Sequence, residues 1–288
     1  MRIIAVTVTY NRINLLKQNI NSILLQSRKP DCFIIVDNKS TDGTSEYLET
    51  VKNDNPGLVH IFTMENNTGG SGGFSFAIKK AFEFGADYIW GMDDDAIPNT
   101  DALAEIETKI ETGSPKTAYF CNTHFIDGSG MVADESVKSD GEIVTKFSFV
   151  GFVLPRQLVS DIGLPRKELF IYYDDYDYQL SMQEAGYKII GIKGAVIKHP
   201  YILVNNNPKR LLFKTITIPI MPDWKMYYWM RNNILIRNKK GRKKWYAIFL
   251  ELYLLVGIFF LDTKQFRIAF KGFCHGIRGI SGHIKGCP

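Results

Sequence analysis

Residues 88–95 read YIWGMDDD, an apolar run that ends in three consecutive aspartates, Asp93, Asp94 and Asp95. A short continuous apolar run is typical of a strand buried in a parallel sheet. Alternate strand residues point to the same side, so Asp93 and Asp95 are placed to bind one cation while Asp94 points elsewhere. Mg²⁺ and Mn²⁺ prefer such oxygen ligands and usually accompany a phosphate. The alternative is a solvated acidic turn.

The chain before this run alternates apolar strand patterns with helical ones. The patterns predict strands at 3–8, 33–36, 59–63 and 88–92, and helices at 13–26, 45–52 and 74–84. This alternation predicts an α/β fold with a Rossmann-like, mostly parallel central sheet and right-handed crossovers. Ligands bind such sheets at the carboxyl ends of the strands, which is where the polar motifs of this chain fall.

Two common nucleotide-binding motifs do not fit. No GxxxxGK[ST] string is present, which excludes a P-loop of the usual kind. Residues 70–75 read GSGGFS, which is GxGxxS rather than GxGxxG, and they follow the third predicted strand instead of the first. A dinucleotide fold is therefore a weak alternative.

A second acidic cluster lies at 170–179, FIYYDDYDYQ, with Asp174, Asp175 and Asp177 among tyrosines. Aromatic surroundings partly desolvate a carboxylate and raise its pKa, which suits a general base. His199 ends the apolar run 195–199, another predicted strand end. A lone histidine is usually structural, but two carboxylate clusters favour a metal-ligand role here.

Composition and charge narrow the class of protein. The 288 residues are 45% hydrophobic, 13% aromatic and 23% charged, which excludes a disordered or low-complexity chain. The length predicts one large α/β domain with an appendage, or two domains. The four cysteines lack metal-finger spacing and are expected to be reduced thiols. The first apolar run is too short for the core of a secretory signal peptide.

The C-terminal part is strongly basic. Residues 237–288 carry eleven Lys/Arg and two acids, so they hold a charge of +9 within a net +5. RNKKGRKK at 237–244 precedes a 17-residue apolar segment, 245–261, that is shorter than the roughly 20 residues needed to span a bilayer. Basic and aromatic residues in this order predict association with an anionic membrane surface. A packed C-terminal helix is the alternative, and the apolar content argues against a nucleic-acid partner.

Taken together, these motifs resemble the inverting glycosyltransferases of family 2, which have the GT-A fold. The resemblance rests on Thr9-Tyr10-Asn11-Arg12, Val36-Asp37-Asn38, the aspartate triplet and Asp174-Asp175. More narrowly, the chain is similar to bacterial galactofuranosyltransferases that use UDP-galactofuranose. That similarity is carried by residues 67–74 (NTGGSGGF), 90–95 (WGMDDD) and 173–175 (YDD), with His199 downstream. It covers about residues 3–200.

The resemblance implies a function for each matching residue. It implies Mn²⁺ or Mg²⁺ bound by Asp93, Asp95 and His199, with Asp175 as the base and Asp174 positioning the acceptor or the base. It also implies that the UDP-sugar is bound by a further set of residues. That set is Thr9, Tyr10, Arg12, Asp37, Asn67, Gly69, Gly70 and Asp94.

The expected reaction is transfer of galactofuranose to a hydroxyl of a glycan or lipid-linked glycan in bacterial surface polysaccharide synthesis, such as O-antigen. We expect a GT-A domain at 1–221 and a helical, membrane-associating region at 222–288. The expected location is cytoplasmic, peripheral on the inner face of the bacterial cell membrane. The aromatic and basic segment 227–233 is expected either to cover the acceptor or to form a packing helix.

Several alternatives stay open. The family often has Trp where this chain has Tyr173. Rhamnosyltransferases that use dTDP-rhamnose share the TYNR start and the basic tail. A sugar-nucleotide pyrophosphorylase would need a Gly-rich basic loop after the first strand, where only Arg12 is basic. A non-catalytic sugar-nucleotide-binding relative would keep the fold without the metal site.

Overall fold

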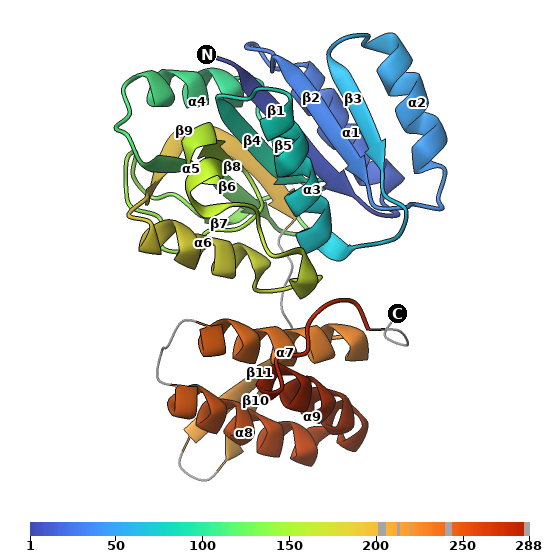
Figure 1. Ribbon diagram of the computed structural model, residues 1–288, viewed down its shortest axis with the longest axis vertical. Coiled ribbons are helices and arrows are strands. Elements are labelled where there is room, and N and C mark those ends of the chain that lie inside the picture. The colour runs from blue at the N-terminus through green and yellow to red at the C-terminus, as the bar shows by residue number, and fades with distance from the viewer. Residues whose placement is uncertain (201–205, 212–213, 220, 240–243, 285–288) are drawn as a thin grey trace. The chain divides into compact units, whose positions relative to one another are not determined.

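The chain forms two compact units in a computed structural model (Figure 1). The structure describes residues 1–200, 206–211, 214–219, 221–239 and 244–284. The first unit is Met1–Arg166 with Asp175–Tyr201, and the second is Lys167–Asp174 with Ile202–Pro288. These units are defined by contacts within the chain and do not test a functional boundary. The domain boundary expected between residues 221 and 222 therefore stays a prediction.

The first unit is built on one mixed sheet. Its strands are β1 (Ile3–Thr9), β2 (Cys32–Asp37), β3 (Val59–Thr63), β4 (Tyr88–Asp93), β5 (Ile97–Pro98), β6 (Thr117–Ile126), β7 (Val132–Glu135), β8 (Phe152–Pro155) and β9 (Lys188–Pro200). They follow the order β3-β2-β1-β4-β8-β6-β9-β5, with β7 paired to β6. The first four strands are parallel, as predicted, whereas β8 runs antiparallel to both of its neighbours. In the second half β9 is parallel to β6, whereas β5, β7 and β8 pair antiparallel, so the sheet is mixed and the expectation of a mostly parallel sheet is correct only in part. No crossover helix is needed where antiparallel strands pair, so the later strands lack the alternating pattern.

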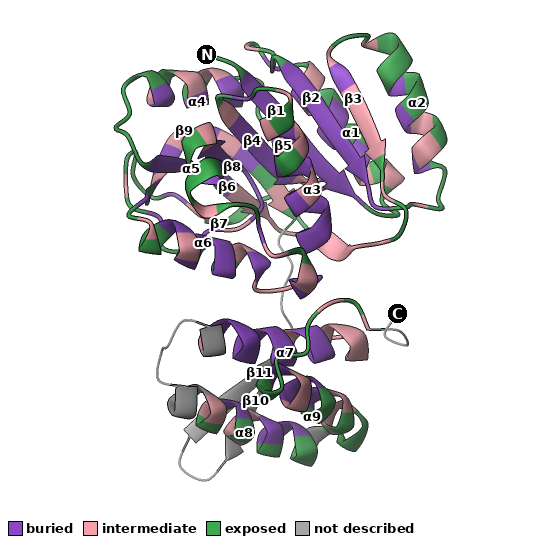
Figure 2. Ribbon diagram, viewed as in Figure 1, coloured by how far each residue is buried: buried purple, intermediate pink, exposed green. Residues whose placement is uncertain are grey.

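Helices cover the two faces of this sheet. They are α1 (Ile13–Leu24), α2 (Thr44–Asp54), α3 (Gly69–Glu83), α4 (Ala102–Glu111), α5 (Arg156–Ile162) and α6 (Asp174–Glu184). Ile4 and Val6 of β1 pack in one core cluster with Phe74 of α3. The alternate residues Ile3 and Ala5 pack in a second cluster that contains α1 and α4 residues. Figure 2 shows the central strands buried along their length, which explains their nearly continuous apolar sequence.

Helix α3 begins at Gly69, five residues before the predicted start at Phe74. Its four early glycines are tolerated because asparagines hold its first turn. Asn67 Oδ1 accepts the Gly69 N–H at 2.9 Å, and Asn38 Nδ2 donates to the Gly69 carbonyl at 2.8 Å. A Cβ on Gly73 would lie 2.4 Å from Val8 Cγ1. At position 73, therefore, only glycine lets the helix pack this closely on β1.

The described residues of the second unit form three helices and a hairpin. The helices are α7 (Asp223–Lys239), α8 (Lys244–Leu261) and α9 (Thr263–Ile277), and the hairpin is β10 (Asn206–Leu211) with β11 (Lys214–Pro219). Asp262 caps α9 by accepting the N–H groups of Lys264 and Gln265 at 2.8 and 3.1 Å. Six of the seven residues of 227–233 on α7 are buried, which favours the packing-helix interpretation of that segment.

Helix α8 has one buried and one exposed apolar face. Leu255 and Ile258 are buried with Glu251, whereas Phe249, Phe259 and Phe260 are exposed. Among the described residues, no helix is long and apolar enough to cross a membrane. The side chains of the basic run lie outside the described residues from position 238 to its end at 244.

Candidate active site

Parallel pairing brings three polar strand ends to one edge of the sheet. In the register of β1, Thr9 lies opposite Asp37 of β2, and Val8 lies opposite Asp93 of β4. The carboxyl ends of parallel strands open toward the same crevice, which is where ligands of α/β sheets bind. The expected clustering of these motifs at the strand ends is therefore observed.

Asp94 is buried at this edge by contacts with the TYNR segment. Thr9 Oγ1 donates to Asp94 Oδ2 at 2.7 Å, and Arg12 Nη1 lies 3.3 Å from Oδ1. Burial raises the pKa of Asp94 to about 6, although the Thr9 hydrogen bond and the Arg12 charge act in the opposite direction. Asp94 is therefore mostly ionised at neutral pH but takes up a proton more readily than an ordinary aspartate.

Asp95 has the opposite balance. Arg12 Nη1 lies 2.8 Å from Asp95 Oδ2, and His199 Nε2 lies 3.2 Å from Oδ1. Burial alone would raise the pKa of Asp95, but His199 and Arg12 together lower it below its ordinary value. Arg12 thus supplies positive charge beside the adjacent carboxylates. The predicted alternation of Asp93 and Asp95 along a strand is wrong, because β4 ends at Asp93 and the next two aspartates lie in a turn.

His199 reaches Asp95 from the penultimate position of β9. Its Nδ1 lies 2.9 Å from the Pro200 carbonyl oxygen, and its ring meets Phe125 of β6 edge to face at 6.0 Å. When Nδ1 carries the proton for that carbonyl, the Nε2 lone pair faces the carboxylate of Asp95. Two electron-rich atoms in this position need a proton or a cation between them.

These atoms fit a divalent cation as a pair of ligands. Asp95 Oδ1 is buried and, among the described residues, makes no hydrogen bond of normal geometry. A carboxylate with an imidazole nitrogen, completed by diphosphate oxygens, is a donor set that Mn²⁺ or Mg²⁺ accepts. Within the described part of the chain, no three His, Cys, Asp or Glu residues gather closely enough to hold a metal. The inclusion of Asp93 as a third ligand stays a prediction.

The remaining residues expected to bind the nucleotide have varied surroundings. Asp37 is buried, with one oxygen 2.9 Å from the Ser40 N–H and the other 3.0 Å from Ser45 Oγ. Tyr10 is 42% exposed at the strand end, where a flat ring is free to meet a base. Asn67 and Gly69 shape the start of α3, and a Cβ on Gly70 would meet open space. Their contacts with a nucleotide stay predictions.

The second acidic motif forms the first turn of α6. The helix begins at Asp174, which is buried, and Asp175 Oδ1 accepts the Tyr176 N–H at 2.7 Å. Loss of hydration raises the pKa of Asp175 to about 6, and the Tyr176 hydrogen bond opposes this only in part. A carboxyl with this pKa is ionised at neutral pH and is a stronger base than an ordinary aspartate.

Sequence reasoning missed what precedes that turn. Phe170, Tyr172 and Tyr173 have φ of 69°, 66° and 66°, a region that bulky side chains seldom occupy. Their carbonyl-rich segment is held by Arg231 and Asn232, about sixty residues later in the chain. The signal in the sequence is an arginine and an asparagine within an aromatic helical segment, but the sequence does not show which residues they contact.

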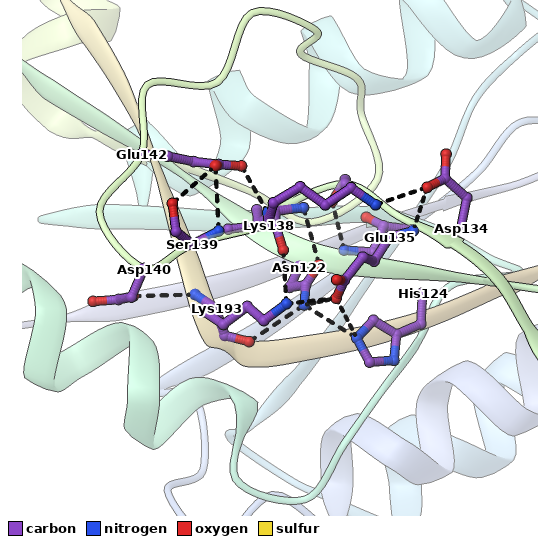
Figure 3. Close-up of polar contacts among 12 residues, drawn as sticks. Asn122, His124, Asp134, Glu135, Lys138, Ser139, Asp140, Glu142 and Lys193 are labelled. Carbon is purple, nitrogen blue, oxygen red and sulfur yellow. Dashed lines mark hydrogen bonds and ion pairs between the residues drawn. The ribbon is translucent and has the colours of Figure 1, made fainter.

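A further polar cluster joins β6, β7 and β9 (Figure 3). Lys193 Nζ lies 2.6 Å from Glu135 Oε2, and the same carboxylate meets Asn122 and His124 at 3.3 and 3.6 Å. Asn122 Oδ1 also accepts the Val137 N–H at 3.0 Å. Because these charges are paired with one another, we interpret the cluster as the attachment of the β7 hairpin to the sheet.

The first comparison with known proteins defines the class. Residues 4–135 match the model of the family described as Glycosyl transferase family 2. The match covers 132 of the 288 residues, so this part of the chain is similar to family 2 glycosyltransferases, and the similarity supports the enzyme class expected from the sequence. The matched range contains β1 to β7 with the Asp94–Asp95 turn, and Asp175 and His199 lie beyond it.

Two curated relatives narrow the comparison. The chain is similar to the galactofuranosyltransferase GlfT1 of Mycolicibacterium smegmatis, at 26% identity over 201 residues that cover 63% of this chain and 65% of the relative. It is also similar to GlfT1 of Mycobacterium tuberculosis, at 24% identity over 280 residues that cover 91% of this chain and 90% of that protein. The match thus spans just under two thirds of the first relative and nearly all of the second.

Solved structures confirm the fold. S. aureus TarS 1-349 in complex with UDP-GlcNAc has a TM-score of 0.62 at 16% identity, covering 96% of this chain and 82% of that one. The mannosyltransferase PcManGT from Pyrobaculum calidifontis, in complex with GDP-Man and Mn²⁺, has a TM-score of 0.56 at 15% identity, covering 96% and 87%. The fold is accordingly α/β and GT-A-like, as expected.

Proposed function

We propose that this chain transfers galactofuranose from UDP-galactofuranose to a hydroxyl group of a glycan acceptor, with inversion at the anomeric carbon. The observation that carries the donor assignment is the 280-residue similarity to an M. tuberculosis galactofuranosyltransferase, which covers 91% of this chain. The solved structure of TarS with UDP-GlcNAc adds a fold relative that binds a uridine sugar nucleotide.

The chemistry proposed for this chain begins at Asp175. Its raised pKa of about 6 makes it a competent base at neutral pH. It removes the proton from the acceptor hydroxyl as that oxygen attacks the anomeric carbon from the face opposite the diphosphate. The new glycosidic bond forms while the bond to the diphosphate breaks, so the configuration inverts. Asp174, the preceding residue, orients the acceptor or the base by hydrogen bonding.

The donor side is proposed to lie around the Asp94–Asp95 turn. Arg12 bridges these two carboxylates with its side chain 48% exposed, so it is able to exchange one of them for a phosphate. Asp93, Asp95 and His199 would hold a divalent cation, which supplies positive charge that stabilises the departing diphosphate. Thr9 keeps Asp94 oriented toward the nucleotide through its 2.7 Å hydrogen bond.

A peripheral membrane location is proposed from the second unit. On α8, Phe249, Leu252, Val256, Phe259 and Phe260 are between 44% and 65% exposed. Their spacing places them on one helical face, which suits insertion into the headgroup region of a bilayer. The basic residues of 237–244 precede this helix and would attract anionic lipids at the cytoplasmic face. A lipid-linked glycan in surface polysaccharide synthesis is the acceptor that such a location favours.

The test is a donor panel with the full-length protein. UDP release is measured with Mn²⁺ from UDP-galactofuranose, UDP-galactopyranose and, as dTDP release, from dTDP-rhamnose, with and without an oligosaccharide acceptor. Acceptor-stimulated UDP release from UDP-galactofuranose alone supports the proposal. Preference for dTDP-rhamnose would make the chain a rhamnosyltransferase. Binding of UDP without turnover of any donor would make it a non-catalytic relative.

A further inference from the structure

The segment that leads into Asp175 has a strained backbone. Between Leu169 and Asp174, three of the four residues have positive φ, and all three are aromatic (Phe170, Tyr172 and Tyr173). Each costs free energy for a side chain with a Cβ, and such conformations persist only where the surroundings hold them. Something in the described structure must therefore restrain this segment.

The amide of Asn232 provides most of that restraint. Its Nδ2 lies 2.9 Å from the Leu169 carbonyl oxygen, 2.8 Å from that of Ile171 and 2.9 Å from that of Tyr172. Two amide hydrogens are thus shared among three carbonyl oxygens of the strained segment. Asn232 is fully buried, so removal of its amide leaves buried carbonyl oxygens without these donors, which costs free energy.

Arg231 holds both the segment and the asparagine. Its Nη2 donates to the carbonyl oxygens of Glu168 and Leu169 at 3.2 and 3.0 Å. Its Nε donates to Asn232 Oδ1 at 2.8 Å, which turns the amide nitrogen toward the segment. The guanidinium also lies 4.7 Å above the ring of Tyr228, on which Phe170 stacks at 4.8 Å. These hydrogen bonds and ring contacts of Arg231 therefore hold the strained segment in one conformation.

We propose that Arg231 and Asn232 are positioning residues for the glycosyl transfer, because they hold the backbone of residues 168–172 in the conformation from which Asp174 and Asp175 emerge. The inference rests on the proposed role of Asp175 as the base. Dihedral angles directly before α6 set where its first turn begins, so relaxation of Tyr172 or Tyr173 to negative φ displaces the base. A displacement of about 1 Å is enough to lower a rate about a hundredfold.

The alternative is that the Arg231–Asn232 pair only stabilises the packing of α7. Asn233 offers a matched control, because it is the next residue of the same helix and is also buried. Its amide donates to Glu251 Oε1 and its oxygen accepts from Arg237 Nε, so it holds α8 and not the strained segment. Asn233→Ala removes the same atoms as Asn232→Ala.

The experiment compares full-length Asn232→Ala, Asn233→Ala and Asp175→Asn with the wild type. The readouts are kcat and KM for sugar transfer, the Kd for UDP with Mn²⁺, and thermal stability. We expect Asn232→Ala to lower kcat about a hundredfold while the KM for the donor and the Kd for UDP change little. Asn233→Ala is expected to lower stability to a similar degree and to retain kcat within a few-fold.

Each other result overturns a defined claim. Near-wild-type kcat in Asn232→Ala, or an equal loss of kcat in both alanine variants, overturns the positioning role. If Asn232→Ala does not fold, Arg231→Lys is the deciding variant, because lysine keeps the charge but lacks the guanidinium that reaches two carbonyl oxygens. A loss of kcat in Arg231→Lys without a change in UDP affinity supports the proposal. Full kcat in that variant overturns it. Retained kcat in Asp175→Asn would instead overturn the base assignment and the proposed mechanism.

Discussion

Adjacent carboxyl groups in this protein have different pKa values because each has different neighbours. Asp94 accepts from the Thr9 hydroxyl and lies 3.3 Å from Arg12 Nη1, whereas Asp95 lies closer to the same nitrogen, at 2.8 Å, and also contacts His199. The pKa of Asp94 is consequently raised to about 6 and that of Asp95 is lowered. Asp95 therefore loses its proton more readily than Asp94, which suits it to bind a cation.

Asp175 sets the first prediction. Asp175→Asn keeps the shape of the side chain and the contact with the Tyr176 N–H but cannot accept a proton. We expect kcat to fall at least about a hundredfold while UDP affinity is retained. In the wild type, the rate is expected to fall as the pH decreases below about 6, because protonation of Asp175 removes the base. A pH–rate profile that is flat between 5 and 8 would contradict this assignment.

The second prediction concerns Asp95 and His199. Asp95→Ala removes a proposed cation ligand from the turn after β4, and Asp95 belongs to neither of the two core clusters of the sheet. The affinity for UDP is expected to lose its dependence on Mn²⁺, which calorimetry with and without EDTA would measure. Asp94→Asn is the control, because it keeps the Thr9 contact and the neighbouring ligands. An unchanged Mn²⁺ effect in Asp95→Ala would show that the cation binds elsewhere.

Residue identities were easier to predict than residue geometry. The aspartate triplet and His199 were identified from the sequence, and the structure brings Asp95 and His199 together. The predicted alternation failed because it assumed a strand through Asp95, whereas the turn begins after Asp93. The role of Arg12 as a bridge between two carboxylates was equally invisible, since it depends on a loop from another strand.

At the scale of elements, the glycines of α3 give a matched pair for the third prediction. Gly73→Ala places a Cβ 2.4 Å from Val8 Cγ1, and we expect it to lower the free energy of unfolding by about 1–3 kcal/mol through overpacking. Gly70→Ala meets open space in the same helix and should raise it by about 0.5–1 kcal/mol. Denaturant melts of both variants test this. Equal effects would mean that α3 does not press on β1 as described.

Helix α8 carries the fourth prediction through its buried carboxyl. Burial raises the pKa of Glu251 to about 7, with Arg237 and Asn233 opposing the shift. Between pH 4.5 and 7 the folded state holds a proton that the unfolded state has lost, so this group's contribution to stability falls as the pH rises. Glu251→Gln should remove this slope, a relative gain on the order of 1–3 kcal/mol at pH 8 compared with pH 5. Thermal melts of the wild type and Glu251→Gln at the two pH values test this. An equal change in melting temperature between pH 5 and pH 8 in both proteins would contradict the prediction.

The ends of helices were predicted well where apolar residues repeat with a single helical period. The helices predicted at 13–26 and 45–52 are found at Ile13–Leu24 and Thr44–Asp54, because each repeats apolar residues on one face. The start of α3 was missed because glycine propensity argued against a helix. In the structure, the first turn is held by Asn67 and Asn38, and that tertiary contact outweighs propensity.

For the whole molecule, the fifth prediction is membrane association. Replacing the six basic residues of 237–244 with Gln should move the protein from the pellet of anionic liposomes to the supernatant, and raised salt should do the same to the wild type. Phe259→Ser with Phe260→Ser should weaken sedimentation independently of salt, because these side chains are 46% and 65% exposed. Transfer to a short soluble acceptor should be unchanged. A wild type that stays in the supernatant at low salt would make α8 an ordinary packed helix.

The sequence predicted the architecture of the first half of the chain well and that of the second half poorly. Strand–helix alternation identified β1 to β4 and their shared edge, because parallel strands need crossovers that leave a regular pattern. The antiparallel β8 and the long β9 follow loops of varied length and leave no such pattern. The inclusion of Lys167–Asp174 in the second unit was also unpredictable, since it depends on contacts with α7.

That inclusion has a consequence for protein synthesis. The carbonyl oxygen of Tyr172 accepts a hydrogen bond from the amide of Asn232, which is synthesised 60 residues later. A nascent chain whose residues up to about 200 have left the exit tunnel has every strand of the first unit, yet residues 168–172 still lack the donors of Arg231 and Asn232. The nascent sheet is therefore expected to bind a nucleotide before it is able to transfer a sugar. Full activity then appears only after α7 has left the exit tunnel.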